Sequence, residues 1–163
     1  MRSNPWIVIP FSFIVALFLT LLPLPLWFEN ARPEWIVLVL LFWIIMFPHR
    51  VNVGVAWMVG LLLDAFNDTL LGEHALALVV VAYVASTMSR RLRVSELWQQ
   101  TISVLLLLLL YHMILFWIQG MIGQPVSASW FWLSAASSAI LWPWIFILLK
   151  DSRRQFTMLH NIE

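Results

Sequence analysis

The segment GLLLDAFNDTLLG, residues 60–72, places two aspartates four residues apart within one of the most apolar stretches of the chain. A carboxylate in apolar surroundings is costly, and it is expected to face a partner group, a water-filled cavity or a helix end. What surrounds Asp64 and Asp68, and what each carboxylate binds, therefore decides how this chain folds.

The composition of the chain indicates that these surroundings are a lipid bilayer. Hydrophobic residues make up 63% of the 163 residues and charged residues 10%, whereas soluble proteins average about 25% charged residues. Since a membrane-spanning helix needs about 20 residues, the chain has room for six spans and none for a folded aqueous domain. We therefore expect an all-α polytopic membrane protein with six transmembrane helices in a single domain over residues 1–163. The chain has no cysteine, and no cofactor, metal or nucleic-acid partner is expected.

Six apolar runs are separated by turn and breaker residues. PLPLW at 23–27 ends the first run, Pro33 suits the first turn of the second, and turn residues around Asp68 separate the third from the fourth. The second span offers only roughly 21 Å of helix against about 30 Å of hydrocarbon, so flanking turns, Trp35 at the interface or local thinning of the bilayer must help it. The predicted spans are about 6–22, 34–47, 51–66, 72–88, 101–122 and 130–149.

Basic residues decide the orientation, because cytoplasmic loops carry most of the Lys and Arg. With both termini cytoplasmic, eight of the nine basic residues fall on the cytoplasmic side and only Arg32 lies outside. Merging the third and fourth spans would put the arginines of SRRLRVSE, residues 89–96, on the wrong side. Six spans with both termini cytoplasmic are therefore predicted, and this basic loop is expected to attract anionic lipid or an acidic cytoplasmic partner.

This topology gives the two aspartates different depths. Asp64 lies about 18 Å of helix beyond Asn52, past the midplane, whereas Asp68 is predicted to lie at the outer interface or to cap the fourth helix. Gly60 lies one turn before Asp64 on the same helix face. We predict that Asp64, with Gly60 beside it, organises the outer half of the bundle or receives a partner, and the sequence leaves both roles open.

An enzymatic reading of the same residues is weaker. Gly60, Asp64 and Asp68 have the spacing found in integral membrane CDP-alcohol phosphotransferases, in which carboxylates on one helix face bind metal. The two earlier aspartates of that motif are replaced here by Trp43 and Met46. Half of the metal site is absent from the sequence, so an enzyme is not expected.

Three further polar residues are candidates for structural or functional roles. His112 lies midway along the fifth span, where it either bonds a neighbouring helix or lines a relay or ligand site. Asn52 is predicted to cap the third helix. Arg50 lies at the same cytoplasmic edge and is a candidate for a structural role or for contact with a partner.

Small residues recur at helical spacing in the sixth span. Ser134, Ala135, Ser138 and Ala139 form a face that another helix can approach closely. Such a face indicates a helix bundle, and a single-pass membrane partner could also lie along a small-residue face.

The order of short motifs resembles one family. RPEW, PHRVNVG, GLLLDAFNDTLLGEHALALVVVAYVA, LWQQ and LWPWIF follow one another before a short basic tail. This order is similar to that of the rod shape-determining protein MreD family over nearly the whole chain, and residues 48–85 carry the most specific part of the resemblance.

The resemblance implies a non-enzymatic scaffold subunit of the bacterial cell-elongation machinery, which maintains rod shape in the inner membrane as a multi-pass protein. The partners it implies are MreC, the actin-like MreB, RodA and the elongation transpeptidase, together with membrane lipid. The family is also similar in architecture to the substrate-binding subunits of energy-coupling-factor transporters. That similarity keeps one alternative open, a small-molecule-binding subunit of a membrane transporter with Asp64 and His112 lining its pocket.

Overall fold

A computed structural model describes residues 5–124 and 128–159 of the chain, and these residues contain helices and no strand. The all-α prediction is therefore confirmed. Three helices, α4, α5 and the part of α6 from Phe131 to Ser152, are long and apolar enough to cross a membrane, and three shorter helices are also apolar. The elements are α1 Pro5–Leu21, the 3-10 turn η1 Glu29–Ala31, α2 Trp35–Met46, α3 Val53–Phe66, α4 Glu73–Val94, α5 Leu97–Ile122 and α6 Ala128–Leu159.

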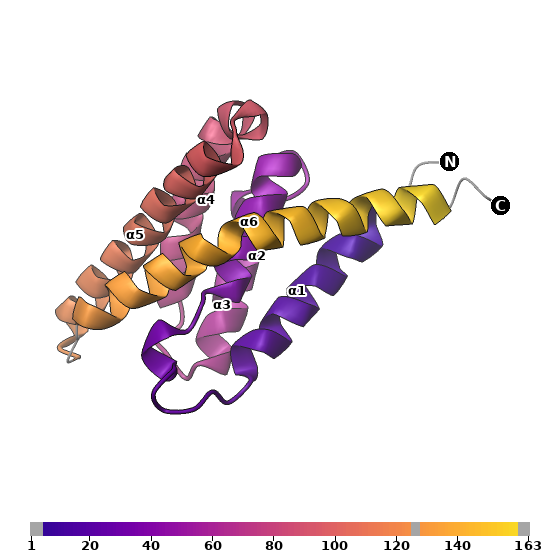
Figure 1. The fold of residues 1–163 in the computed structure, drawn as a ribbon. Helices are drawn as coiled ribbons and strands as arrows, with labels where there is room; N and C mark the ends of the chain where they lie inside the picture. The colour runs from indigo at the N-terminus through magenta and orange to yellow at the C-terminus, as the bar shows by residue number, and fades with distance from the viewer. Residues whose placement is uncertain (1–4, 125–127, 160–163) are drawn as a thin grey trace.

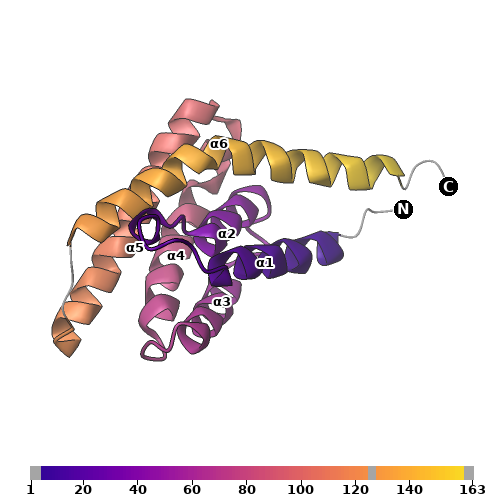
Figure 2. The same cartoon turned by 60° about the horizontal axis from the view of Figure 1, so that its bottom comes forward.

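Successive helices run in alternating directions, so the turns gather at two ends of the molecule. The turns between α2 and α3 and between α4 and α5 lie at one end, and the turns that precede α2 and α4 lie at the other (Figure 1). Helices α4 and α5 lie side by side, and α6 crosses the bundle at a steep tilt (Figures 1 and 2). The start of α1 and the end of α6 project on the same side of the molecule in both views.

The short helix α2 is the centre of the fold. Residues 36–45 are all buried, and α2 packs against α1, α4 and α6. A helix that is hydrophobic on every side must be enclosed, and here protein encloses it. The sequence analysis called on flanking turns, Trp35 or a thinned bilayer to accommodate this short span. In the structure, side chains of neighbouring helices surround α2, so its length does not have to match the thickness of the hydrocarbon.

Both ends of α2 are closed by polar groups from other helices. The Ser138 hydroxyl of α6 accepts a hydrogen bond of 2.9 Å from the backbone N–H of Glu34 at the start of α2. At the other end, Nε and Nη2 of Arg93 on α4 donate to the Ile45 carbonyl at 3.1 and 3.0 Å. A backbone N–H or C=O group without a hydrogen-bond partner costs on the order of several kcal/mol in lipid, as it does in other apolar media. These contacts therefore let α2 end within the bundle.

The small-residue face of α6 is occupied by this chain. Its four residues are buried, and the Ser134 hydroxyl donates to the Arg32 carbonyl at 2.8 Å. The segment that leads into α2 thus fills this face of α6. The close approach permitted by its small residues is used inside the chain, so this face is closed to a single-pass partner.

The predicted basic loop at 89–96 is also wrong in part. Residues 89–94 continue α4 to Val94, and only Ser95 and Glu96 separate α4 from α5. The Gln100 amide of α5 donates to the Leu92 carbonyl at 2.8 Å and so closes the end of α4. Arginines are good helix formers, and they extend the helix beyond its apolar part without breaking it.

Replacing Arg93 by Gln should lower the free energy of unfolding by about 1 kcal/mol, because the Ile45 carbonyl loses its charged donor inside the bundle. Arg91→Gln removes the same charge two residues earlier on the same helix, from a residue that is exposed as Arg93 is, and it is the matched control. Thermal unfolding of both variants in one detergent measures the difference. Equal midpoints for the two variants would contradict the role assigned to Arg93.

Candidate functional site

The Asp64 carboxylate, in the last turn of α3, binds the first turn of α4. Asp64 is fully buried, with 0% of its surface exposed. Oδ2 accepts from the backbone N–H groups of Gly72 at 2.8 Å and Ala75 at 3.4 Å, and Oδ1 accepts from that of His74 at 2.9 Å. Helix α4 begins after Gly72 and has no cap from its own flanking side chain. Asp64 therefore caps α4 from the preceding helix.

Two side chains complete the surroundings of this carboxylate. His74 Nδ1 lies 2.7 Å from Oδ1, and the Thr69 hydroxyl donates to Oδ1 at 3.1 Å. A carboxylate offers about four lone-pair sites, and five contacts from one turn and one helix start use them. The partial positive charge at the start of α4 also favours the negative charge. Burial of Asp64 is thus compensated within the α3–α4 hairpin.

Gly60 makes the approach of α4 possible. A Cβ atom placed on Gly60 would lie 2.3 Å from the Ala75 Cα, 2.7 Å from the Ala75 nitrogen and 3.0 Å from the His74 carbonyl carbon. These atoms are backbone and cannot move aside as a flexible side chain can. Gly60 and Asp64, one turn apart on the same face of α3, therefore act together, the first by leaving room and the second by binding the N–H groups.

Asp68 does not cap α4, so the capping alternative predicted for it is wrong. Asp68 is exposed in the turn between the helices and has a left-handed backbone with φ of 51°, a conformation that Asp tolerates better than most residues. The turn folds the start of α4 back against α3. Asp64 lies eight to eleven residues before the N–H groups that it binds, and it caps α4 instead.

Further polar contacts in this half of the bundle connect the hairpin to α5. The Gln119 amide donates to the buried Glu73 carboxylate at 2.6 Å. His112 is buried, with Nδ1 at 2.9 Å from the Leu108 carbonyl of its own helix and Nε2 at 3.5 Å from Oε1 of Glu34. The candidate His112 thus faces the start of α2. Sequence reasoning gave no role to Glu73, although its place directly after the Gly72 turn is a signal for a helix start.

Arg50 and Asn52 lie at the opposite end of α3. The Asn52 side chain accepts from the N–H groups of Gly54 at 3.0 Å and Val55 at 3.4 Å, so the predicted cap of the third helix is confirmed. The Arg50 guanidinium lies 6.0 Å from the centre of the Phe47 ring. The predicted residues are therefore not one site: Gly60 and Asp64 hold one end of the hairpin, and Arg50 and Asn52 lie at the other.

The chemistry of the Asp64 cluster is that of a structural clamp. Within residues 5–124 and 128–159, no group of three or more His, Asp or Glu side chains is arranged to hold a metal ion. The acceptor positions of Asp64 face N–H and O–H groups of this chain. We therefore assign to Asp64 the positioning of α4.

Asp64→Asn should destabilise the protein by about 2 kcal/mol, because the amide nitrogen replaces an acceptor with a donor that faces other donors. Asp68→Asn removes the same charge from the exposed turn and should change stability by less than about 0.5 kcal/mol. Unfolding in detergent and abundance in membranes measure both effects. An Asp64→Asn variant as stable as Asp68→Asn would exclude the clamp.

Gly60→Ala should cost about 1 to 3 kcal/mol, because the added methyl group overpacks the contact between the α3 and α4 backbones. The matched control is Gly120→Ala in α5, where an added Cβ meets nothing within 4 Å and Ala is the better helix former. Gly60→Ala is expected to lower the thermal midpoint, and Gly120→Ala is expected to raise it. A stabilising Gly60→Ala would show that the helices do not approach as closely as described.

Comparisons with known proteins agree with the order of motifs. The family model for rod shape-determining protein MreD matches residues 1–152. The rod shape-determining protein MreD of Haemophilus influenzae (strain Rd) is 33% identical over 153 residues, which cover 92% of this chain and 93% of the relative. No solved structure matches the chain significantly. The family model spans most of the chain, and the relative aligns along nearly its whole length, so this chain belongs to the rod shape-determining protein MreD family.

Proposed function

We propose that this protein is a non-enzymatic scaffold subunit of the bacterial elongation machinery, which binds MreC and links MreB to lateral peptidoglycan synthesis. Membership of the family gives it a role in cell shape. RodA and the elongation transpeptidase are further proposed partners. The proposed location is the bacterial inner membrane, crossed six times with both termini cytoplasmic, as the distribution of basic residues favours.

An apolar groove between α1, α2 and α6 carries the proposal for a membrane partner. The hollow has a volume of about 320 Å³, and except for two serines its described lining is apolar. It forms because α1 packs mainly on α2, while α6 passes at a distance. Phe11 of α1 and Leu148 of α6 are 64% and 67% exposed at its walls, so the groove opens toward lipid.

The groove suits a single transmembrane helix such as the one expected in MreC. Ser12 and Ala16 form part of its lining and are buried, and small residues at the base of a groove let a partner backbone approach closely. The hydrophobic effect contributes little between helices in lipid, so packing against such a shaped surface must supply the affinity. The small-residue face of α6 is already filled by this chain, whereas the groove is a shaped apolar surface with exposed walls.

No observation favours the alternative of a transporter subunit that binds a small molecule. Asp64 and His112, the two residues proposed to line its pocket, are buried and bonded to this chain. Neither is among the described residues that line the groove or the two hollows discussed below.

A photo-crosslinking amino acid at Phe11 or Leu148 should capture MreC in membranes at native expression, because both side chains lie at the walls of the groove. The same amino acid at Trp57 or Leu62, which are exposed on α3, should capture it at least about tenfold less. Immunodetection of the crosslinked product measures the difference. Capture from the α3 positions alone would show that MreC binds another face of the protein. Recovery of an ATPase module or a bound solute would contradict the proposed scaffold function.

A further inference from the structure

A basic hollow lies at the end of the bundle opposite Asp64. It has a volume of about 460 Å³ and lies between the turn that joins α2 to α3 and the last turns of α4. Its cationic side chains are Arg50, Arg90 and Arg93, and His49 adds a fourth basic group. We propose that this hollow binds the phosphate of an anionic phospholipid headgroup.

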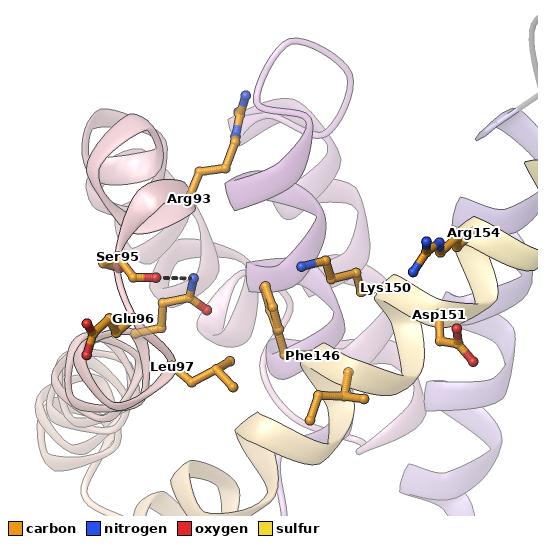
Figure 3. A pocket seen from close by; sticks show the side chains of 10 residues that line it. Arg93, Ser95, Glu96, Leu97, Phe146, Lys150, Asp151 and Arg154 are labelled. Carbon is orange, nitrogen blue, oxygen red and sulfur yellow. Dashed lines mark hydrogen bonds between the residues drawn. The ribbon is translucent and has the colours of Figure 1, made fainter.

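The first observation is the sign of the charge. Among the described residues that line the hollow there is no carboxylate. The neighbouring hollow of about 520 Å³, drawn in Figure 3, combines Lys150 and Arg154 with Glu96 and Asp151. Arg93 borders both hollows, and Figure 3 shows its side chain directed away from Lys150 and Glu96. An anion is therefore favoured in the first hollow more than in the second.

The second observation is that Arg93 is held in place. Its Nε and Nη2 atoms donate to the Ile45 carbonyl, which fixes the plane of the guanidinium at the end of α2. A guanidinium carries five N–H donors, so this contact leaves donors for a further acceptor. An ordered arginine binds phosphate with good geometry and loses little freedom in doing so.

The third observation favours a lipid over a soluble anion. On α4, the exposed residues Leu76, Val80 and Tyr83 lie at spacings of four and three, and Thr87 and Arg90 continue the same stripe. Residues at this spacing share one face of a helix. An acyl chain along the apolar part of the stripe brings its headgroup to Arg90 at the edge of the hollow. Basic pockets between helices at the membrane surface are typical sites for anionic headgroups.

The test measures lipid binding by native mass spectrometry of the delipidated full-length protein in detergent. Dioleoyl phosphatidylglycerol should bind more tightly than zwitterionic dioleoyl phosphatidylcholine. Replacing both Arg50 and Arg90 by Gln should weaken phosphatidylglycerol binding about fivefold for each arginine removed. Arg90→Gln alone provides a second variant in case the double variant is poorly folded. The control is the double variant with Arg91→Gln and Arg154→Gln, which loses the same charge at two positions outside the hollow. It should bind phosphatidylglycerol as tightly as the unaltered protein does.

Three results would overturn the proposal. Equal weakening in the control would mean that only the overall positive charge attracts the lipid. Displacement of the lipid by inorganic phosphate at comparable concentration would indicate a site for a soluble anion. Displacement by a hexaglutamate peptide at comparable concentration would indicate a surface for an acidic protein segment.

Discussion

The contact on which the rest of the structure depends is the one between the Asp64 carboxylate and the first turn of α4. The first N–H groups of a helix have no partner within the helix, and inside a membrane protein water is a poor substitute. Asp64 supplies the acceptors from α3, and Gly60 lets the two backbones come close enough for the bonds to form. The direction in which α4 leaves this turn is thereby fixed, and α4 in turn forms one wall around α2.

The same solution recurs at the ends of other helices. Arg93 binds the Ile45 carbonyl near the end of α2, and Ser138 accepts the N–H at the start of α2. Gln100 binds the Leu92 carbonyl near the end of α4. Helices of twelve to fourteen residues leave a large share of their backbone groups at the ends. Both ends of α2 and the start of α4 find a polar side chain on a neighbouring helix, whereas the start of α3 is capped by its own flanking residue Asn52. Helix ends in this fold are points of attachment between helices, and they explain why polar residues are sparse but placed at specific positions.

The sequence predicted what depends on local patterns. Apolar runs predict the all-α class and six helices, and Asn52 is predictable as a cap because an Asn side chain accepts from N–H groups two and three residues later in the chain. The sequence offers Asp68, in the turn before α4, as one possible cap of that helix, whereas the actual cap comes from Asp64 across the turn. Likewise, the small residues of α6 indicated a close approach but could not show that the segment before α2 makes it. Those contacts depend on how the helices pack, which a single sequence does not give.

Helix α4 connects the two ends of the bundle. Its first turn is held by Asp64, and its last turns carry Arg93, which closes α2, and Arg90, which lines the basic hollow. Over 22 residues a helix extends about 33 Å as one stiff element. The position of the basic end therefore depends on how the first turn is fixed at the far side of the bundle. A change at Asp64 should displace the arginines without contacting them, so effects of Asp64 variants on the basic end do not by themselves place Asp64 at an interface.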